Sequence, residues 1–175
     1  TIVEERGKGD ILLKQGQVPS KCYTVIEGCV REFTFQKGVE QTTGFFVEGD
    51  RITPHTYDES AEPSQHFLEC MEDCVLTSSD RKFEKHLLTL IPRLAEFMAE
   101  FIVEELKKSK TEWTRFITST PEERYVHLME TRPSLFHRVP HHQIASYLGM
   151  QPQSLSRIRK RIFEKEILSS NGSVV

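Results

Sequence analysis

The sequence has few of the features that mark a membrane-spanning or disulfide-stabilised protein. It contains no run of about 18 apolar residues, so it predicts no helix that crosses a membrane. Cysteine is scarce, and no pair has the C-x-x-C spacing of a zinc or redox motif: Cys22, Cys29, Cys70 and Cys74. We therefore expect free, mostly buried thiols in a reducing cytosol, and no metal site.

Residue sets typical of enzymes are also missing. No Ser/His/Asp set, metal triad or glycine-rich phosphate loop stands out, and Asp58 and Glu59 are better read as loop charges. The start, TIVEERGKGD, lacks the basic-then-apolar order of a secretion signal and reads as a chain already in progress, so we expect residues before Thr1. These absences indicate a cytoplasmic protein that is not an enzyme.

What is present falls into two parts with different patterns. Up to about Ser79, short runs of Val, Ile, Tyr, Phe and Thr are separated by glycine about every ten residues, as in an antiparallel sandwich or barrel. From about Asp80 the apolar spacing is helical, with a short helix over DRKFEKHLLTL and a long one from about Pro92 to Ile117. The chain is therefore expected to be α+β.

The long helix carries apolar residues mostly three or four positions apart. At about 25 residues it would be about 38 Å long, more than a small domain needs to cover its own core. This apolar stripe suits pairing with a second copy of the chain, which we favour over packing on the sheet alone. The expected dimer contacts are Leu94, Met98, Phe101, Ile102, Leu106 and Trp113, and Phe116 and Ile117 continue the stripe.

The next helix begins with a capping pattern. Thr120 can cap it, Pro121 suits its first turn, and Glu123 stands three residues after Thr120, as in a capping box. This helix is expected to end before Pro133.

The stretch HHQIASYLGMQPQSLSRIRKRIF, residues 141–163, has the pattern of two helices joined by a tight turn. Ile144 and Leu148 share one face of the first helix, and the small Ala145 leaves room for a crossing helix. Gly149 can take the left-handed conformation that ends a helix.

The second helix of this stretch starts after a residue that points back inward, Met150. Pro152 fits its first turn, and its buried face is expected to be Leu155, Ile158 and Ile162. The order of small residue, glycine and later apolar residue is that of a helix-turn-helix.

The opposite face of the second helix is polar and basic. Arginine can hydrogen-bond guanine and glutamine adenine in a bidentate way, while serine and lysine suit phosphate oxygens. A basic helix face is often only a solvated surface, but here it coincides with a complete helix-turn-helix pattern, so we favour double-stranded DNA as partner. The expected DNA-binding residues are Gln151, Gln153, Ser154, Arg157, Lys160 and Arg161.

The stretch IASYLGMQPQSLSRIRK resembles the DNA-binding helices of the CRP/FNR family of bacterial transcription regulators. GDILLKQG, CYTVIEGCVR and FFVEGD are similar to the start of that family's cyclic-nucleotide-binding β-roll. The resemblance implies an α+β fold with an N-terminal antiparallel, jelly-roll-like β-roll, a long dimerisation helix and a C-terminal winged helix-turn-helix. The implied domains are residues 1–90, 91–118 and 119–175. EKEILSSNGSVV is similar to the beginning of the wing hairpin, cut short.

The resemblance also implies a mechanism. A symmetric dimer would place two recognition helices in successive major grooves and read a palindrome, with RNA polymerase as a further partner. The family's base-contacting positions fall on Pro152, Gln153 and Arg157, so the half-site should differ from that of relatives with arginine first. Gln151 stands where a capping serine or threonine is common, which should weaken the cap by about 1 kcal/mol.

The ligand pocket departs from the family pattern. Members that bind cyclic AMP carry Gly-Glu and then Arg-Ser or Arg-Thr, whereas this chain has Pro54 in the first pair and Pro63-Ser64 as the second. Ser64, with Ser109 on the long helix, is all that remains, and Glu62 would repel a phosphate. We expect a degenerate pocket that does not bind cyclic AMP, with no cofactor, unless a rerouted loop brings Arg51 inward.

The leading interpretation is a dimeric, site-specific DNA-binding regulator. One alternative is a true cyclic-nucleotide receptor, and another is a haem sensor that uses His55, Tyr57 or His66. The third is that the sheet domain is a protein-interaction module and the helices serve assembly.

Overall fold

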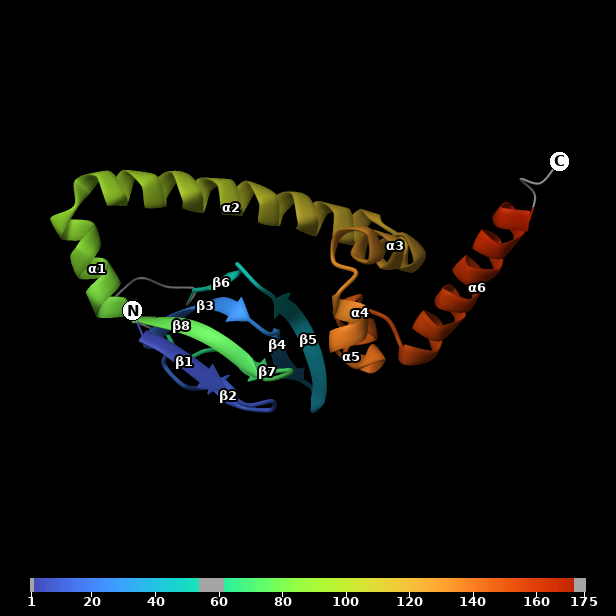
Figure 1. Cartoon of the computed structure of the whole chain (residues 1–175), viewed down its shortest axis with the longest axis horizontal. Helices are drawn as coiled ribbons and strands as arrows, with labels where there is room; N and C mark the ends of the chain where they lie inside the picture. Colours follow the sequence, from blue (N-terminus) through green and yellow to red (C-terminus); the bar gives the residue numbers. More distant parts are fainter. Residues whose placement is uncertain (1, 54–61, 172–175) are drawn as a thin grey trace. The chain divides into compact units, whose positions relative to one another are not determined.

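The computed structural model describes residues 2–53 and 62–171, with strands in the first half of the chain and helices in the second (Figure 1). The predicted α+β class is confirmed. The chain divides into two compact units, one up to Thr114 and one from Arg115 onwards. The strands are β1 (Ile2–Arg6), β2 (Ile11–Leu13), β3 (Lys21–Glu27), β4 (Val30–Gln36), β5 (Val39–Phe46), β6 (Arg51–Ile52), β7 (Phe67–Cys70) and β8 (Cys74–Asp80).

The described strands form two antiparallel sheets of four strands each, with the orders β1-β8-β3-β6 and β2-β7-β4-β5. Side chains from both sheets meet in one hydrophobic core, in which Val25, Val30 and Leu76 are fully buried. Because successive residues of a strand point to opposite faces, the alternating apolar residues of the sequence fill this core. The predicted antiparallel sandwich is therefore confirmed, and we call it the β-domain (residues 2–80).

All four cysteines lie buried in the β-domain as free thiols, as predicted. Burial raises the pKa of Cys70 to about 12 and that of Cys22 to about 11, so both are protonated at neutral pH. Among the described residues, no group of three or more His, Cys, Asp or Glu is placed to hold a metal ion.

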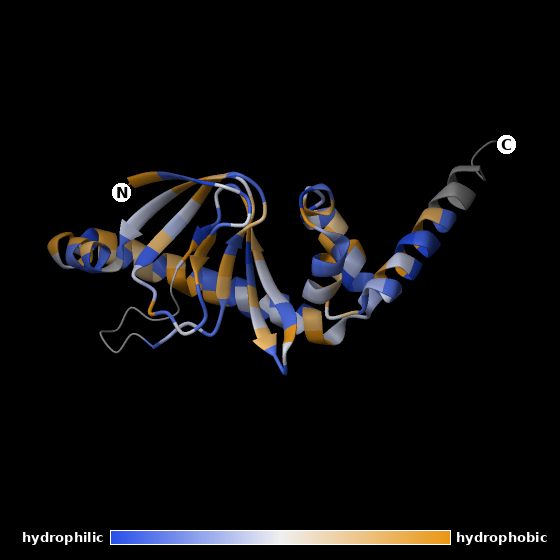
Figure 2. Cartoon of the chain, turned by 90° about the horizontal axis from the view of Figure 1, so that it is seen from below, coloured by the Kyte–Doolittle hydropathy of each residue, from blue (hydrophilic) through white to orange (hydrophobic). Residues whose placement is uncertain are grey.

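Two helices follow the β-domain directly. Helix α1 (Arg81–Leu90) is capped by Asp80, whose carboxylate accepts hydrogen bonds from the backbone N–H groups of Lys82 and Phe83. Helix α2 (Pro92–Thr118) has 27 residues, or about 40 Å, which confirms the predicted long helix. Figure 2 shows hydrophobic residues along α2 as well as within the β-domain.

Helix α3 (Pro121–Thr131) has the predicted capping box. The Thr120 hydroxyl accepts from the backbone N–H of Glu123, and the Glu123 carboxylate accepts from the backbone N–H of Thr120. The helix ends before Pro133, also as predicted. A short helix, α4 (Leu135–Arg138), follows, and its Leu135 is fully buried.

The predicted start of a wing hairpin after Phe163 is wrong for the residues that the structure describes. Helix α6 (Pro152–Asn171) continues through them. The physical reason is local: no glycine or proline stands between Pro152 and Gly172, and Lys160 and Glu164 form an i,i+4 ion pair at 3.9 Å. Residues 172–175 lie outside the described part. No helix in that part is both long and apolar enough to cross a membrane.

Candidate nucleic-acid interface and cavity of the β-domain

The predicted helix-turn-helix is present as α5 (His141–Tyr147), a tight turn and α6. The predicted apolar faces of both helices lie in a core that also includes Tyr125 and Leu128 of α3. Ile162 and Met150 are half-buried. The fully or nearly fully buried residues of the motif are Ile144, Ala145, Leu148, Leu155 and Ile158.

The turn between α5 and α6 is closed by two backbone hydrogen bonds. The N–H of Met150 donates to the carbonyl of Ala145 at 2.9 Å, and the N–H of Gly149 donates to that of Ser146 at 3.0 Å. This pair is the Schellman arrangement, which needs a residue in the left-handed region. Gly149 has a φ of 69°, as the sequence predicted. The turn sets where α6 begins relative to α5.

A charged side chain of α3 ties this turn to the end of α2. The Arg124 guanidinium donates to the carbonyl of Leu148 at 2.7 Å and lies over the ring of Phe116, 4.4 Å from its centroid. A Cβ on Gly149 would lie 3.1 Å from Arg124 Nη1 and 3.3 Å from Phe116 Cζ. The last turn of α2, the start of α3 and the helix-turn-helix therefore pack as one body.

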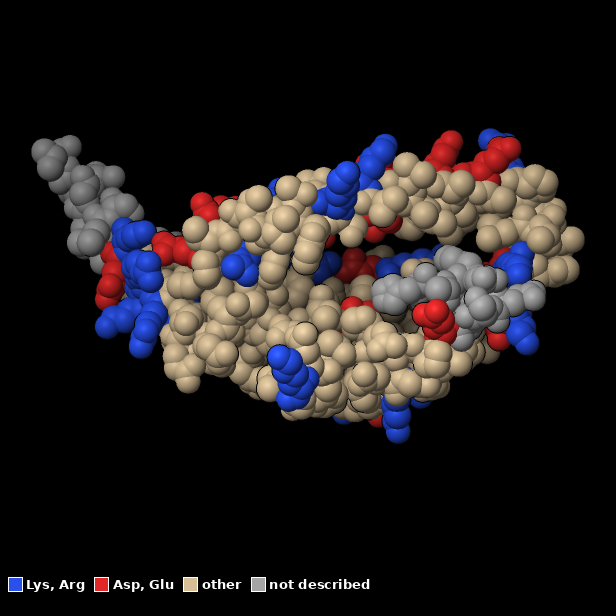
Figure 3. Space-filling model, turned by 180° about the vertical axis from the view of Figure 1, so that it is seen from behind, with Lys and Arg blue, Asp and Glu red and all other residues tan. Residues whose placement is uncertain are grey.

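Every predicted DNA-binding residue is exposed on α6 or just before it. Gln153, Arg157 and Lys160 follow one another at i, i+4 and i+7, so they share one side of the helix. Figure 3 shows Lys and Arg side chains gathered beside the described end of α6. Arg157 has no ion-pair partner among the described residues. The backbone carbonyl of Gln151 accepts hydrogen bonds from the first turn of the helix.

Other basic side chains of α6 have partners that the sequence did not indicate. Glu122 of α3 binds Arg161, with Nη1 and Oε2 2.8 Å apart, and Lys165, with Nζ and Oε1 3.2 Å apart. Arg159 lies 2.7 Å from Nδ1 of His141, and burial together with this guanidinium lowers the pKa of His141. Arg161 thus differs from Arg157, although both were expected to bind DNA. The contact with Glu122 spans 39 positions of sequence, so no local spacing rule predicts it.

The apolar stripe of α2 is uncovered in the single chain. No residue of the helix is fully buried, and Leu94 and Met98 are half-buried. Phe101 is 43% exposed, Leu106 69% and Trp113 63%. Ile102 is also exposed, so the structure does not show the middle of this stripe packed on the sheet.

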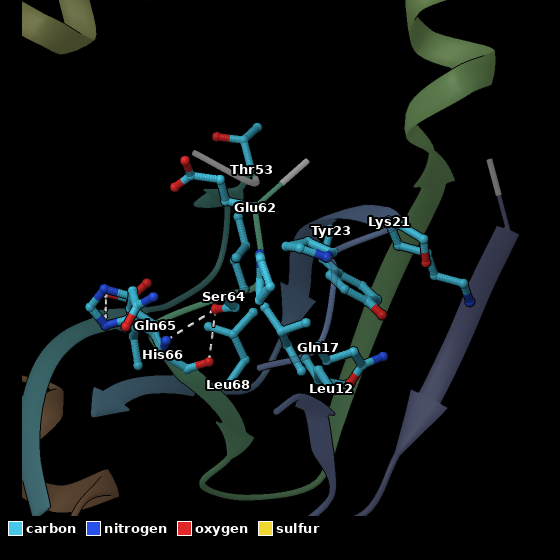
Figure 4. Close-up of a pocket in the computed structure, with 16 residues that line it drawn as sticks. Leu12, Gln17, Lys21, Tyr23, Thr53, Glu62, Ser64, Gln65, His66 and Leu68 are labelled. Atoms are coloured by element: carbon cyan, nitrogen blue, oxygen red, sulfur yellow. Dashed lines mark hydrogen bonds and ion pairs between the residues drawn. The ribbon is translucent and has the colours of Figure 1, made fainter. Parts of the chain in front are cut away.

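The β-domain contains a cavity of about 310 Å³ (Figure 4). Its apolar part comes from both sheets, through Leu12, Ile52 and Leu68. Pro63 and Ser64, two residues of the predicted degenerate pocket, line it. The hydroxyl of Ser64 is engaged with the backbone of His66, to whose carbonyl it donates at 2.9 Å and from whose N–H it accepts at 3.0 Å.

Two other predicted pocket residues are not among those that line the cavity. Ser109 is exposed on α2, so the described cavity is built from the β-domain alone. Arg51 is bound to Glu84 at 2.7 Å and does not line the cavity either. Pro54, with His55 and Tyr57, lies outside the described residues.

The described lining has two carboxylates and no arginine. The carboxylate of Glu32 accepts from the Thr43 hydroxyl at 2.8 Å and lies 4.0 Å from Nδ1 of His66. Glu62 also lines the cavity, and the ammonium of Lys21, another lining residue, is bound to Glu4. A buried phosphate needs a cationic partner, so this lining does not favour the binding of an anion.

The chain is similar to known regulators along almost its full length. No family profile matches it. It is 24% identical over 180 residues to the fumarate and nitrate reduction regulatory protein of Vibrio cholerae, covering 96% of this chain and 71% of that one. It is 22% identical over 183 residues to the transcriptional activator protein Anr of Pseudomonas protegens, covering 96% and 73%.

Solved structures have the same fold. FixK2 from Bradyrhizobium japonicum superposes with a TM-score of 0.78 at 18% identity, covering 95% of this chain and 86% of that one. A CooA mutant from Carboxydothermus hydrogenoformans gives a TM-score of 0.68 at 18% identity, covering 94% and 77%.

Over more than nine tenths of its length the chain is similar to transcription regulators in sequence and shares the fold of the solved structures, which supports the predicted resemblance to the CRP/FNR family. The relatives that it matches are named as regulators, which agrees with the prediction of a regulator that is not an enzyme.

Proposed function

We propose that the chain is a dimeric regulator that reads a palindromic DNA site with α6. The observation that carries the proposal is the exposed row of Gln153, Arg157 and Lys160 on the second helix of a closed helix-turn-helix. The residues nearest the start of such a helix enter the major groove. Gln153 and Arg157 are therefore the base readers, and Ser154 and Lys160 contact phosphates.

In this proposal α2 is the dimerisation helix. Its stripe is exposed in the single chain, and hydrophobic side chains at helical spacing are stabilised by packing against a second copy of themselves. A dimer would read a palindromic site, because its two-fold axis presents two recognition helices to half-sites about one turn of DNA apart. Some relatives are named as transcriptional activators, and we therefore propose RNA polymerase as a further partner. We also propose that the protein is located in the cytoplasm.

The β-domain is, in the same proposal, a jelly-roll-like module that does not take cyclic AMP. Cyclic AMP would bring a full negative charge into a cavity whose described lining includes Glu32 and Glu62 but no arginine. Such a charge is strongly penalised without a cationic partner. We propose that the protein works without a cyclic nucleotide or haem.

Selection of bound sequences from random double-stranded DNA tests the DNA-binding proposal directly. Titrations of the selected site and of a scrambled duplex at several salt concentrations then separate the roles on α6. Arg157→Ala should cost about 1–3 kcal/mol on the selected site and relax preference at one base pair. Lys160→Ala should weaken both duplexes and reduce the salt slope by about 1. Equal weakening of both duplexes by Arg157→Ala would contradict its role as a base reader.

A further inference from the structure

Glu122, in the first turn of α3, holds two basic side chains of α6 with its two carboxylate oxygens. Oε2 lies 2.8 Å from Arg161 Nη1, and Oε1 lies 3.2 Å from Lys165 Nζ. Arg161 and Lys165 are four residues apart, so they stand above one another on the same side of the helix. One carboxylate therefore binds a row of two cations.

This row is distinct from the row proposed to read DNA. Each step of four residues turns a helix by about 40°, so Arg161 lies to the side of Arg157, and Lys165 lies further round again. Arg157 has no ion-pair partner in the described part of the chain, whereas Arg161 and Lys165 share one. The neighbouring acid, Glu123, is engaged at the start of its own helix by Thr120, which leaves Glu122 as the residue that faces α6.

We propose that Glu122 determines the specificity of DNA binding by keeping Arg161 and Lys165 from phosphates and by fixing that side of α6 against α3. Contacts between cations and phosphates add affinity without sequence information. Glu122 thus lowers the affinity for every DNA sequence, and by fixing that side of α6 against α3 it keeps the base readers oriented, which favours the selected site. This inference rests on the proposed function, and Glu122 acts as a positioning residue that touches no base.

A purely structural role for Glu122 predicts something different. All three side chains are partly exposed, at 28% for Glu122, 56% for Arg161 and 66% for Lys165, and exposed ion pairs contribute little to folding. Glu122→Gln should therefore unfold at nearly the same temperature as the wild type. Its effect should appear in the salt dependence of DNA binding.

The test compares the full-length wild type with Glu122→Gln on the selected site and on a scrambled duplex. Two released cations should steepen the plot of log affinity against log salt by about 1–2. Between about 200 and about 50 mM salt, the variant should thus gain about tenfold more affinity for the scrambled duplex than the wild type gains. The ratio of specific to non-specific affinity should fall, because both duplexes gain the phosphate contacts but only the selected site loses contacts to well-oriented base readers.

Glu130→Gln is the matched control, because it removes the same charge from an exposed acid of the same helix that has no ion-pair partner among the described residues. A slope change as large in Glu130→Gln would mean that only net charge matters, and would overturn the proposal. Arg161→Gln should leave the slope unchanged in the wild type and reduce it by about 1 in the Glu122→Gln background. An unchanged slope in Glu122→Gln also overturns it. A wild type that binds DNA with no salt dependence would instead overturn the proposed function itself.

Discussion

The guanidinium of Arg124 donates a 2.7 Å hydrogen bond to the backbone carbonyl of Leu148, at the point where the first helix of the motif ends. The carbonyl at this end of a helix carries partial negative charge, so a cation suits it. Because the same guanidinium lies over Phe116 of α2, three helices meet beside Gly149.

Gly149→Ala should destabilise the C-terminal unit. The left-handed φ of 69° costs a residue with a Cβ about 1–2 kcal/mol, and the added atom would also press on Arg124 and Phe116. Gly16→Ala is the control, since Gly16 has a φ of 83° but no atom within 4 Å of an added Cβ. Urea unfolding followed by circular dichroism should show the larger loss for Gly149→Ala. Equal losses would mean that the contacts relax freely.

Leu106→Glu should split the dimer. Leu106 is 69% exposed in one chain, and a carboxylate there would be buried without a partner in a paired interface. Sedimentation should show a folded monomer with weak DNA binding. Lys108→Glu, about 200° round the same helix, is the matched control and should remain dimeric. If Leu106→Glu stays dimeric, the pairing surface lies elsewhere.

Cyclic AMP and cyclic GMP should not bind at micromolar concentration. The described lining of the cavity includes no arginine, and Arg51 is held by Glu84. Calorimetry with either nucleotide should show no heat, and the affinity for the selected DNA should not change. Micromolar binding would disprove this expectation, and loss of that binding in Arg51→Ala would identify Arg51 as the phosphate partner.

Glu4 should stabilise the folded protein at neutral pH, and this contribution should be lost at acid pH. A hydrogen bond from Lys21, and another from Ser78, hold the pKa of the Glu4 carboxyl at about 2 instead of 4.5. A lowered pKa in the folded state stabilises the protein above the unfolded pKa, and this contribution is lost as the pH falls through the folded value. The gap in urea midpoint between wild type and Glu4→Gln should therefore be complete above about pH 4.5 and shrink toward pH 2.

The matched control for this pH series is Glu5→Gln, because Glu5 is the exposed neighbour on the same strand. Its gap to the wild type should stay small at every pH. A gap for Glu4→Gln that does not change between pH 7 and pH 3 would show that the ion pair with Lys21 does not form in solution.

Features set by neighbouring residues could be predicted from the sequence. The capping box at Thr120, the glycine turn at Gly149 and the length of α2 each depend on residues a few positions apart, and all three are confirmed. The helix-turn-helix was recognisable for the same reason, since its apolar residues recur at helical spacing. The prediction of a wing hairpin after Phe163 was wrong because it relied on the resemblance to the family and not on the uninterrupted helical pattern of these residues.

Apart from the continuation of α6 after Phe163, the sequence by itself therefore determined where the main helices and strands lie and which residues of α6 face outward. Only the tertiary structure decided how the exposed cations are used. Arg157 and Arg161 are four residues apart and chemically identical, yet Glu122 reaches one of them because α3 packs beside α6. In the same way, Arg51 is bound by Glu84 across a fold that joins residues 33 positions apart. Local patterns follow from backbone periodicity, whereas the partner of a charged side chain depends on which distant segments the core brings together.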